Sequence, residues 1–432
     1  MTNNNENKVL NVPTKREQCQ TCLSIAERAE LRPKGNVPNL RFPEFTGEWK
    51  VERLDEIATL SKGIGISKEQ LSNNGEPCIL YGELYTKYKS EIIKEIDSRT
   101  NIDNSKLKRS KANDVIIPCS GETAIDIATA RCVPFDNILL GGDLNIISLY
   151  QYDGAFMSYQ LNGKRKYDIA KVAQGVSVVH LYGEHLKAII TYTPCLQEQQ
   201  KIAKLLSLLD ERIATQNKII DKLQSLISGL NDFLHLQVGG FSTSFEELGT
   251  SYSGLSGKSG DDFGKGKPYI TYLNIYSNSI VNEDQVDYVV IGDNEKQNTL
   301  LYGDLLFTLS SETPDEVGIG AVYLGESDKY YLNSFCFGLH MTAANKVYSP
   351  YLAYLVSNSI FRKFIYPLAQ GSTRFNLHKN DFMKKKFLLP TFENQKEIAR
   401  TLNTLSSKLE TERKLLLNYQ EQKQYLLGSM FI

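Results

Sequence analysis

Residues 197–236 read QEQQKIAKLLSLLDERIATQNKIIDKLQSLISGLNDFLHL, and this stretch decides how the rest of the chain is organised. Its apolar residues recur at alternating steps of four and three, the heptad pattern of a helix that packs along one face. The seam positions are Ile202, Leu206, Leu209, Ile213, Gln216, Ile220, Leu223, Ile227, Leu230 and Leu234. Pro194 precedes the stretch and Gly239-Gly240 follows it, so residues typical of helix boundaries mark both ends. A helix this long with so narrow an apolar stripe needs a partner helix.

A second stretch, 196 positions later, repeats the pattern after Pro390. Its seam positions are Ile398, Leu402, Leu405, Leu409, Glu412, Leu416, Tyr419, Lys423, Leu426 and Met430. The polar seam position Gln216 returns as Glu412, and a polar residue inside an apolar seam lowers stability but fixes the register. Two unrelated leucine-rich amphipathic helices would also look alike, so the helices alone do not establish a repeat.

The similarity extends into the regions that precede the two helices. Ala173-Gln174-Gly175 matches Ala369-Gln370-Gly371 at the same offset of 196. Ser120–Thr123 resembles Ser310–Thr313, and Pro77, Ile79, Tyr81 and Tyr85 match Pro268, Ile270, Tyr272 and Tyr276. The small drift in offset indicates short insertions in loops, where insertions are tolerated best. The sequence therefore predicts a tandem duplication of a globular unit followed by a long helix.

The duplication sets the expected domains. We predict an extension of unknown role at 1–35, globular units at 36–194 and 239–390, a central helix at 195–238 and a C-terminal helix at 391–432. Short β-prone segments separated by turn residues dominate both units, so we expect the α+β class. The expected strands are 78–81, 115–117, 138–140, 144–149, 188–192, 269–275, 286–291, 305–309, 320–324 and 335–340. The expected helices within the units are 51–60, 181–186 and 351–365.

Composition limits the classes of function. The chain has 432 residues and a formal net charge of −1, which excludes a uniformly basic nucleic-acid binder but allows a local basic face. Seven cysteines, no signal-peptide pattern and no apolar run of 18 residues predict a reducing, cytoplasmic location away from membranes. Cys19 and Cys22 are the only close pair, and neither a second pair nor histidines at ligand spacing follow. We therefore expect no metal site.

Catalytic signatures are missing. The chain has no dinucleotide fingerprint, P-loop, His-Glu-x-x-His or Gly-x-Ser-x-Gly sequence. The Asn/Asp-Pro-Pro-aromatic signature of an amino-methyltransferase is absent as well. Ser120-Gly121-Glu122-Thr123 could form a nucleophile loop, but its second copy lacks the glycine and neither copy has an obvious histidine partner. A turn or strand end is favoured there, so we expect a chain that does no bond chemistry and holds no cofactor.

Positive charge gathers in short clusters. The cluster residues with the potential to neutralise DNA phosphates are Lys108, Arg109, Lys164, Arg165, Lys166, Lys265, Lys267 and Lys379. Each cluster alone is more often a solvated surface, but their presence in both units of a neutral chain favours function.

The turns after the two Ala-Gln-Gly sequences share a frame and differ in chemistry. The first reads GVSVVH at 175–180 and the second GSTRFN at 371–376. Arg374 and Asn376 suit the edges of guanine and adenine, whereas Val178 and His180 would read something else. Ser177, His180, Thr373, Arg374 and Asn376 are accordingly the predicted base-facing residues. A helix-capping turn whose side chains have drifted is the alternative.

Several of these features together resemble a known family. They are NVPNLRFPEF at 36–45, Gly47-Glu48-Trp49, Leu54-Asp55-Glu56-Ile57, the two Ala-Gln-Gly turns, and the Pro-x-x-x-x-Gln sequences at 194–199 and 390–395. The chain resembles the specificity (S) subunits of type I restriction-modification systems, from about Asn36 onward. Residues 1–35 fall outside the resemblance.

The resemblance implies a division of labour. Each unit would be a target recognition domain that binds one half of a bipartite site in double-stranded DNA. The two helices would pair antiparallel as a spacer and dock two methyltransferase (M) subunits. Those subunits would bring S-adenosylmethionine, and restriction (R) subunits would add ATP- and Mg-dependent chemistry, leaving this chain non-catalytic.

Two other classes of function stay open. A coiled-coil adaptor with duplicated protein-binding domains would show no DNA binding even with M subunits present. An enzyme of unfamiliar type would use Ser120 and Glu122 or the Cys19 pair, and its activity would be lost on replacing Ser120 or Cys19.

Overall fold

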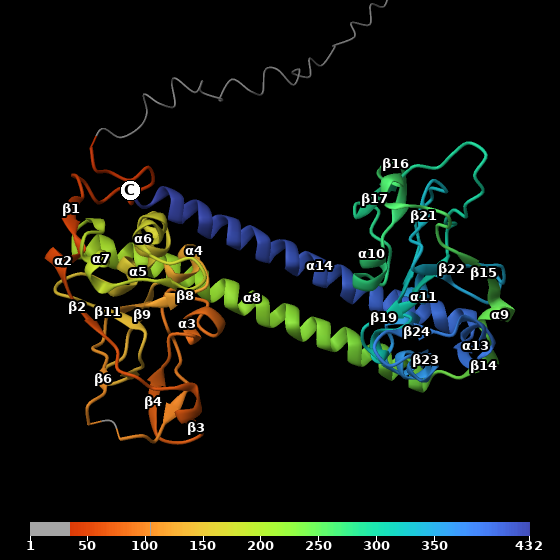
Figure 1. Ribbon diagram of the computed structural model, residues 1–432, viewed down its shortest axis with the longest axis horizontal. Helices are drawn as coiled ribbons and strands as arrows, with labels where there is room; N and C mark the ends of the chain where they lie inside the picture. The colour runs from red at the N-terminus through yellow and green to blue at the C-terminus, as the bar shows by residue number, and fades with distance from the viewer. Residues whose placement is uncertain (1–34, 104) are drawn as a thin grey trace, which may run out of the picture. The chain divides into compact units, whose positions relative to one another are not determined.

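The computed structural model describes residues 35–103 and 105–432 and divides the chain into two compact units (Figure 1). Unit 1 contains the chain up to Thr215 together with Leu416–Ile432, and unit 2 contains Gln216–Leu415. Each unit therefore holds one globular body and half of each long helix. The predictions for Cys19, Cys22 and the extension before Gly35 lie outside the described residues.

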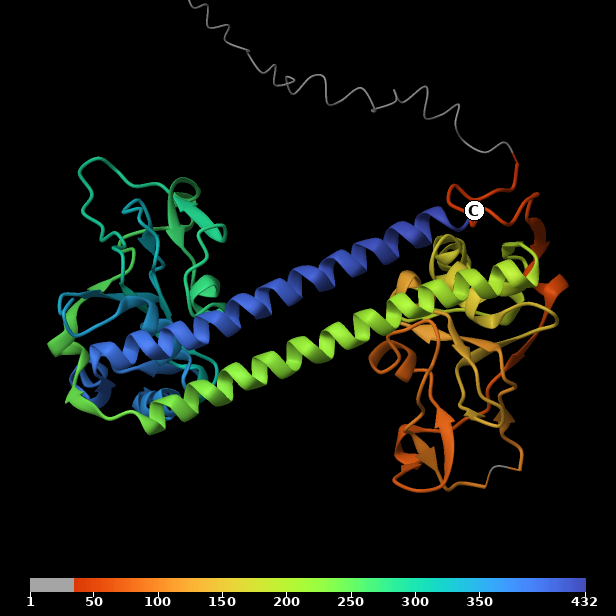
Figure 2. The same ribbon diagram turned by 180° about the vertical axis from the view of Figure 1, so that it is seen from behind.

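Two long helices carry the predicted seams. Helix α8 spans Leu196–Gln237 and helix α14 spans Phe392–Ser429, and both are continuous in Figures 1 and 2. The buried seam residues are Ile202, Leu206, Leu209, Gln216, Ile220, Ile398, Leu402, Leu409 and Met430. The half-buried ones are Ile213, Leu223, Ile227, Leu230, Leu234, Leu405, Glu412, Leu416, Tyr419, Lys423 and Leu426. Most other positions of the two helices are exposed, which confirms the heptad prediction.

The two helices run antiparallel. In unit 1 the Lys423 ammonium lies 2.6 Å from the Asp210 carboxylate. In unit 2 the Gln216 amide donates to the Glu412 carboxylate at 2.6 Å and to the Glu412 backbone carbonyl at 3.0 Å. As α8 advances from Asp210 to Gln216, its partner on α14 moves back from Lys423 to Glu412. The two polar seam residues that the sequence pairs as counterparts are thus bonded to each other.

Unit 1 is built on an antiparallel sheet in the order β2-β11-β7-β9. These strands are β2 (Ala58–Lys62), β11 (Leu144–Leu149), β7 (Asp114–Pro118) and β9 (Arg131–Val133). A second sheet has the order β3-β5-β4-β10-β6, with β3 (Leu71–Ser72), β5 (Arg99–Thr100), β4 (Glu76–Ile79), β10 (Leu139–Leu140) and β6 (Lys108–Arg109). Two pairs complete the unit: β1 (Lys50–Arg53) with β13 (Ile190–Thr193), and β8 (Ser120–Gly121) with β12 (Val179–His180). Its helices are α2 (Leu54–Ile57), the 3-10 turn Lys68–Gln70, α3 (Glu83–Thr86), α4 (Ala124–Ile127), α5 (Gly154–Asn162), α6 (Lys166–Val172) and α7 (Gly183–Lys187).

Unit 2 repeats this plan with an antiparallel sheet in the order β15-β22-β18-β20. These strands are β15 (Gly249–Ser253), β22 (Cys336–Met341), β18 (Leu305–Thr308) and β20 (Gly320–Val322). The others are β14 (Gly240–Thr243) with β25 (Phe387–Pro390), β17 (Val286–Val289) with β16 (Phe263–Ile270) and β21 (Tyr331–Leu332), and β19 (Ser310–Ser311) with β24 (Phe375–Leu377) and β23 (Ala369–Gln370). Its helices are α9 (Phe245–Leu248), α10 (Tyr272–Ser277), α11 (Ser349–Ser357), α12 (Ser359–Ile365), α13 (Lys379–Lys384) and 3-10 turns at Gly260–Asp262, Pro314–Glu316 and Tyr366–Leu368. The matching strand order confirms the internal repeat and the α+β class.

Three of the predicted elements differ from the structure in type or continuity, and the others agree to within two residues at each end. The helix expected at 51–60 is only the four residues of α2, because the flanking residues pair as β1 and β2. The strand expected at 269–275 ends at Ile270, where Thr271 caps α10 by accepting from the Asn274 N–H at 3.1 Å. The helix expected at 351–365 breaks at Asn358, whose side-chain oxygen caps α12. In each case a cap or a distant strand overrides the local pattern.

An aromatic cluster closes the core of unit 1 beside the helix ends. Trp49 is 2% exposed and packs edge-on against Phe156 and Phe431, with ring centroids 5.7 and 6.4 Å apart. Phe156 and Phe431 also contact each other at 5.2 Å. These three rings seal the end of α14 against the body of unit 1.

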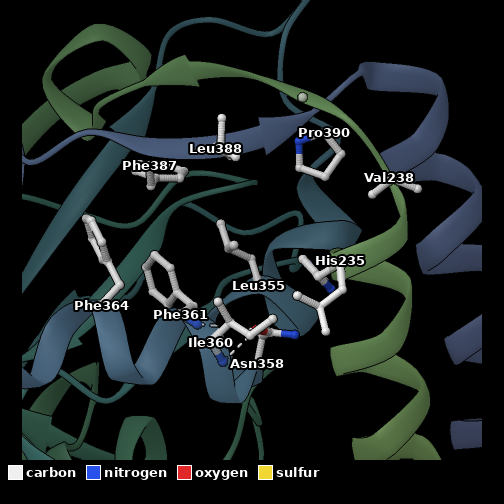
Figure 3. Close-up of a pocket in the computed structure, with 12 residues that line it drawn as sticks. His235, Val238, Leu355, Asn358, Ile360, Phe361, Phe364, Phe387, Leu388 and Pro390 are labelled. Carbon is white, nitrogen blue, oxygen red and sulfur yellow. Dashed lines mark hydrogen bonds between the residues drawn. The ribbon is translucent and has the colours of Figure 1, made fainter.

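Unit 2 lacks that seal. His235 takes the place of Phe431 and stacks on Tyr351 at 5.4 Å, while Gly240 stands where unit 1 has Trp49. The missing ring leaves an apolar pocket of about 340 Å³ (Figure 3). Figure 3 shows His235 of α8 and Val238, which follows α8, on one side of the pocket, with the phenylalanines of α12 and β25 on the other.

Candidate nucleic-acid interface

The turn after each Ala-Gln-Gly is a hairpin that is held against a strand from the central part of its unit. In unit 2, β24 lies between β23 and β19, so Asn376 is opposite both Gln370 and Ser310. In unit 1 the backbones of Gln174 and His180 exchange hydrogen bonds of 2.9 and 2.7 Å, and His180 is opposite Ser120. The predicted common frame is therefore present in both units.

A glycine fixes the shape of each turn. Gly175 has φ +123° and Gly371 has φ +141°, a region that side chains with a Cβ rarely adopt. A Cβ on Gly175 would lie 2.1 Å from the Val178 carbonyl oxygen, and one on Gly371 would lie 2.1 Å from the Arg374 carbonyl oxygen. Only glycine fits, and the same close approach in both copies places Val178 and Arg374 at equivalent positions.

The turn of unit 2 presents polar side chains to solvent. Thr373, Arg374 and Asn376 are all exposed. One guanidinium nitrogen of Arg374 donates to the Ser310 hydroxyl at 3.1 Å, and the guanidinium carbon lies 5.7 Å from the centre of the Phe335 ring. Phe335 is itself 56% exposed. Sequence reasoning missed these two supports, because the pairing of β19 with β24 could not be seen in the local pattern.

The turn of unit 1 is more apolar. Val176 is 96% exposed and Val178 is 55% exposed, while Ser177 and His180 are exposed polar groups. A cavity of about 650 Å³ opens beside the turn. It is lined by Ser177, Val178, Ser120, Glu122, Asp126, Tyr81 and Tyr85 among others. Glu122, Asp126 and Arg131 thus line the cavity beside unit 1's turn, and Val178 stands where unit 2's turn has Arg374.

Ser120 has a histidine neighbour, contrary to the sequence prediction. The hydroxyl of Ser120 lies 3.3 Å from Nδ1 of His180, because the antiparallel pairing of β8 with β12 places the two residues opposite each other. A nucleophile-base pair also needs a third group that orients the histidine. No carboxylate of the described residues hydrogen-bonds to His180, so this pair does not form a triad.

The aligned tyrosines do not keep equivalent roles. The Tyr85 hydroxyl donates to the Ser120 carbonyl at 2.8 Å, and in unit 2 the matching bond to the Ser310 carbonyl, also 2.8 Å, comes from Tyr272. Tyr272 aligns in sequence with Tyr81, not with Tyr85. Tyr276 instead donates to Glu316, which lowers the pKa of that carboxyl and keeps it ionised.

The predicted basic residues fall into two groups. Lys164, Lys265 and Lys267 are exposed, and within the described residues no carboxylate lies at ion-pair distance from them. Lys108 and Lys166 are half-buried, again without an acidic partner in that part of the chain. These five remain available to meet phosphates.

The other three are engaged within the protein. Arg165 donates to the Ile432 carbonyl at 3.0 Å, contacts Asp168 at 3.1 Å, and its side chain is only 18% exposed. Arg109 contacts Glu76 at 2.5 Å. Lys379 packs over the Phe337 ring, where burial lowers its pKa.

Residues 35–103 and 105–432 contain neither a membrane-spanning helix nor a metal-binding cluster of side chains. No helix in these ranges is long and apolar enough to cross a membrane. No group of three or more His, Cys, Asp or Glu side chains in them is placed to hold a metal ion.

Comparison with known proteins places this arrangement in a family. The family model described as type I restriction modification DNA specificity domain matches residues 46–225 and 250–419, one match for each repeat. The MjaVIII specificity subunit of a type I restriction enzyme from Methanocaldococcus jannaschii is 24% identical over 399 residues, which cover 87% of this chain and 89% of that protein.

Two solved structures share the fold. The S subunit of a type I restriction-modification system from M. genitalium matches with a TM-score of 0.55 and 18% identity, covering 92% of this chain and 99% of that one. A chain from a study of complex assembly and conformational transition in the type I R-M system matches with a TM-score of 0.56 and 14% identity, covering 90% and 98%. With both repeats matched by the family model, this chain belongs to the type I restriction modification DNA specificity family.

Proposed function

We propose that this chain is the sequence-reading subunit of a type I restriction-modification complex, with recognition domains at 36–194 and 239–390. Each domain reads one half of a bipartite site in double-stranded DNA. The observation that carries this proposal is the shared turn, in which one backbone frame presents Val178 and His180 in one unit and Arg374 and Asn376 in the other. A constant scaffold with different side chains suits two half-sites of different sequence.

The paired helices supply the spacing in this proposal. Two domains that each bind their half-site weakly bind the whole site strongly when they are linked, because the second binding event is intramolecular. The gap between half-sites must then match the protein geometry, as it does for other proteins that bind split sites. The exposed outer faces of α8 and α14 are available to dock two M subunits.

Catalysis belongs to the partners in this scheme. The M subunits bring S-adenosylmethionine, and the R subunits bring ATP- and Mg-dependent chemistry. In this scheme the Ser120–His180 contact belongs to the frame of the turn, and the chain itself is non-catalytic. The five described cysteines are unpaired, which supports a reducing, cytoplasmic location.

A genome-wide map of N6-methyladenine, made with and without this gene, tests the proposal. We expect a split motif, two short half-sites around a fixed gap, that disappears when the gene is deleted. If the map is unchanged although an active M subunit co-purifies with the chain, the specificity role is wrong and the adaptor alternative takes its place.

The exposed lysines allow a second test. Replacing Lys265 and Lys267 together with alanine should weaken binding to all DNA sequences alike and lower the slope of log affinity against log salt by about two. Binding of the M-containing complex to the cognate site and to an unrelated duplex, over a range of salt concentrations, measures both effects. Lys386→Ala is the control, since Lys386 is already paired with Glu247.

A further inference from the structure

Arg374 is held differently from Arg362 and from three of the lysines on the body of unit 2. Arg362 donates to three backbone carbonyls, Lys258 and Lys386 are paired with carboxylates, and Lys385 donates to a carbonyl. Arg374 contacts only a neutral hydroxyl, that of Ser310, and the face of an aromatic ring. Among the described residues, no carboxylate lies at ion-pair distance from its guanidinium.

Ser310 and Phe335 fix the direction of the guanidinium and leave most of its hydrogen-bond donors available. The planar group carries five N–H donors in a rigid fork, and the bond to Ser310 uses one of them. Phe335 lies against the guanidinium and restricts its tilt. What remains is an exposed, oriented set of donors at the tip of a hairpin, and a two-stranded β-ribbon is one of the shapes that the major groove of DNA admits.

We propose that Arg374 reads a guanine in the half-site of unit 2, by donating two hydrogen bonds to its O6 and N7 atoms. This inference rests on the proposed function of the chain. An arginine fork is the usual partner of guanine in the major groove, because the two acceptor atoms match the spacing of two donors. A phosphate contact tolerates a mobile side chain, whereas a base contact needs the fork held in the plane of the base, as Ser310 and Phe335 hold it here.

The other unit does not make this contact at the equivalent position. Val178 occupies the place of Arg374, and its side chain has no hydrogen-bond donor. We therefore expect guanine to be required at the position contacted by this turn only in the half-site of unit 2.

The test uses the complex of the full chain with its M subunits and begins from the site found by methylation mapping. Duplexes are prepared with 7-deazaguanine, which lacks N7, at each guanine of the site in turn. At one position of one half-site, we expect 7-deazaguanine to lower the affinity of the wild-type complex on the order of 10–100-fold. In the complex with Arg374→Ala, that same substitution should cost little, and the other half-site should keep its full discrimination.

Two variants separate this contact from a general electrostatic one. Phe335→Ala keeps the charge of Arg374 but removes the ring that packs against its guanidinium. We expect this variant to discriminate less between guanine and 7-deazaguanine at the same position. Lys265→Ala should weaken all duplexes alike and leave discrimination intact.

Three results would overturn the assignment. Arg374→Ala could weaken every duplex equally with a lower salt slope, which would make it a phosphate contact. It could leave binding unchanged, or the unit 2 half-site could contain no guanine whose N7 matters. Failure of the proposed function itself is distinguishable, because the wild-type complex would then show no bipartite site at all.

Discussion

His235 and Phe431 occupy equivalent places in the two units, yet one is titratable and the other is not. Nδ1 of His235 lies 2.8 Å from the Asn231 carbonyl and must donate to it, so Nε2 accepts from the Tyr351 hydroxyl at 2.7 Å. Burial lowers the pKa of His235 below its ordinary value of 6.5. The folded unit therefore holds the neutral imidazole.

This arrangement predicts an acid sensitivity of unit 2. Because the pKa of His235 is lower in the folded state, the unfolded state takes up the proton first as the pH falls. The stabilisation is complete above about pH 6.5 and is lost as the pH falls from there toward the lowered pKa. His235→Phe, which copies unit 1, should flatten the fall in the unfolding midpoint between pH 7 and 5.

The variant should also be less stable at pH 8 by about 1–3 kcal/mol, because the buried Tyr351 hydroxyl loses its partner. Thermal unfolding of both proteins across the pH range measures the two effects. Parallel curves for variant and wild type would show that His235 carries none of the pH dependence.

At the residue scale the sequence located the turns but not their supports. The repeated Ala-Gln-Gly marks both hairpins, and the glycine conformations explain why that residue recurs. Ser310 lies 64 positions before Arg374, and the neighbour of Ser120 is 60 positions away. Such neighbours depend on strand register, which no local pattern encodes.

Among the elements, the contact of α14 with the body of unit 1 depends on a buried charge cluster. The Lys423 ammonium lies 2.6 Å from both Glu91 and Asp210, and all three side chains are at most 13% exposed. The Tyr159 hydroxyl donates to Asp210 at 2.6 Å. In unit 2 the corresponding Tyr354 hydroxyl donates to the neutral side chain of Asn403 at 2.5 Å.

Removing the cation should therefore be costly. Lys423→Met removes the cation that lies between two buried carboxylates and should destabilise unit 1 by about 3–5 kcal/mol. Denaturant unfolding measures the change. Lys201→Met, which removes an exposed pair with Glu44, is the matched control and should change the midpoint little. Equal effects for the two variants would contradict the view that burial sets the cost.

The elements that could be predicted are those with a local period. The long helices were found because their seams repeat over ten positions each. Helix α5 was missed because seven of its nine residues are buried, so it has no polar face to reveal a helical period. Strand β6 was missed because two residues are too few to show an alternation.

For the whole molecule, the helix pair predicts that the gap between the half-sites can be changed without changing the bases that are read. One heptad inserted after Ile220 in α8 and another after Leu409 in α14 keeps the seam in phase and lengthens both helices by about 10 Å. We expect both half-sites to persist and the gap to grow by up to about three base pairs. Methylation mapping of the variant reads out all three quantities.

The control inserts four residues into α8 alone, which throws the seam out of phase and should abolish the paired site. A heptad variant that kept the gap but changed the bases would refute the spacer role.

The sequence predicted the duplication and the helix pair at this scale because both are repeats within one chain. It could not predict the bases, because they depend on the side chains of the turns and on supports that lie far away in the sequence.

The contact of Gln216 with Glu412 shows how a chain with two copies differs from a symmetric dimer of one copy. Had two identical copies of one repeat paired antiparallel, the residue at this position would have faced its own twin. Two glutamines can hydrogen-bond to each other there, whereas two glutamates would set like charges together. Glutamine at this position is therefore compatible with a symmetric dimer of one repeat, and glutamate is tolerated in this chain because glutamine stands opposite it. A single chain with two copies likewise allows the two turns to carry different residues, Val178 in one and Arg374 in the other.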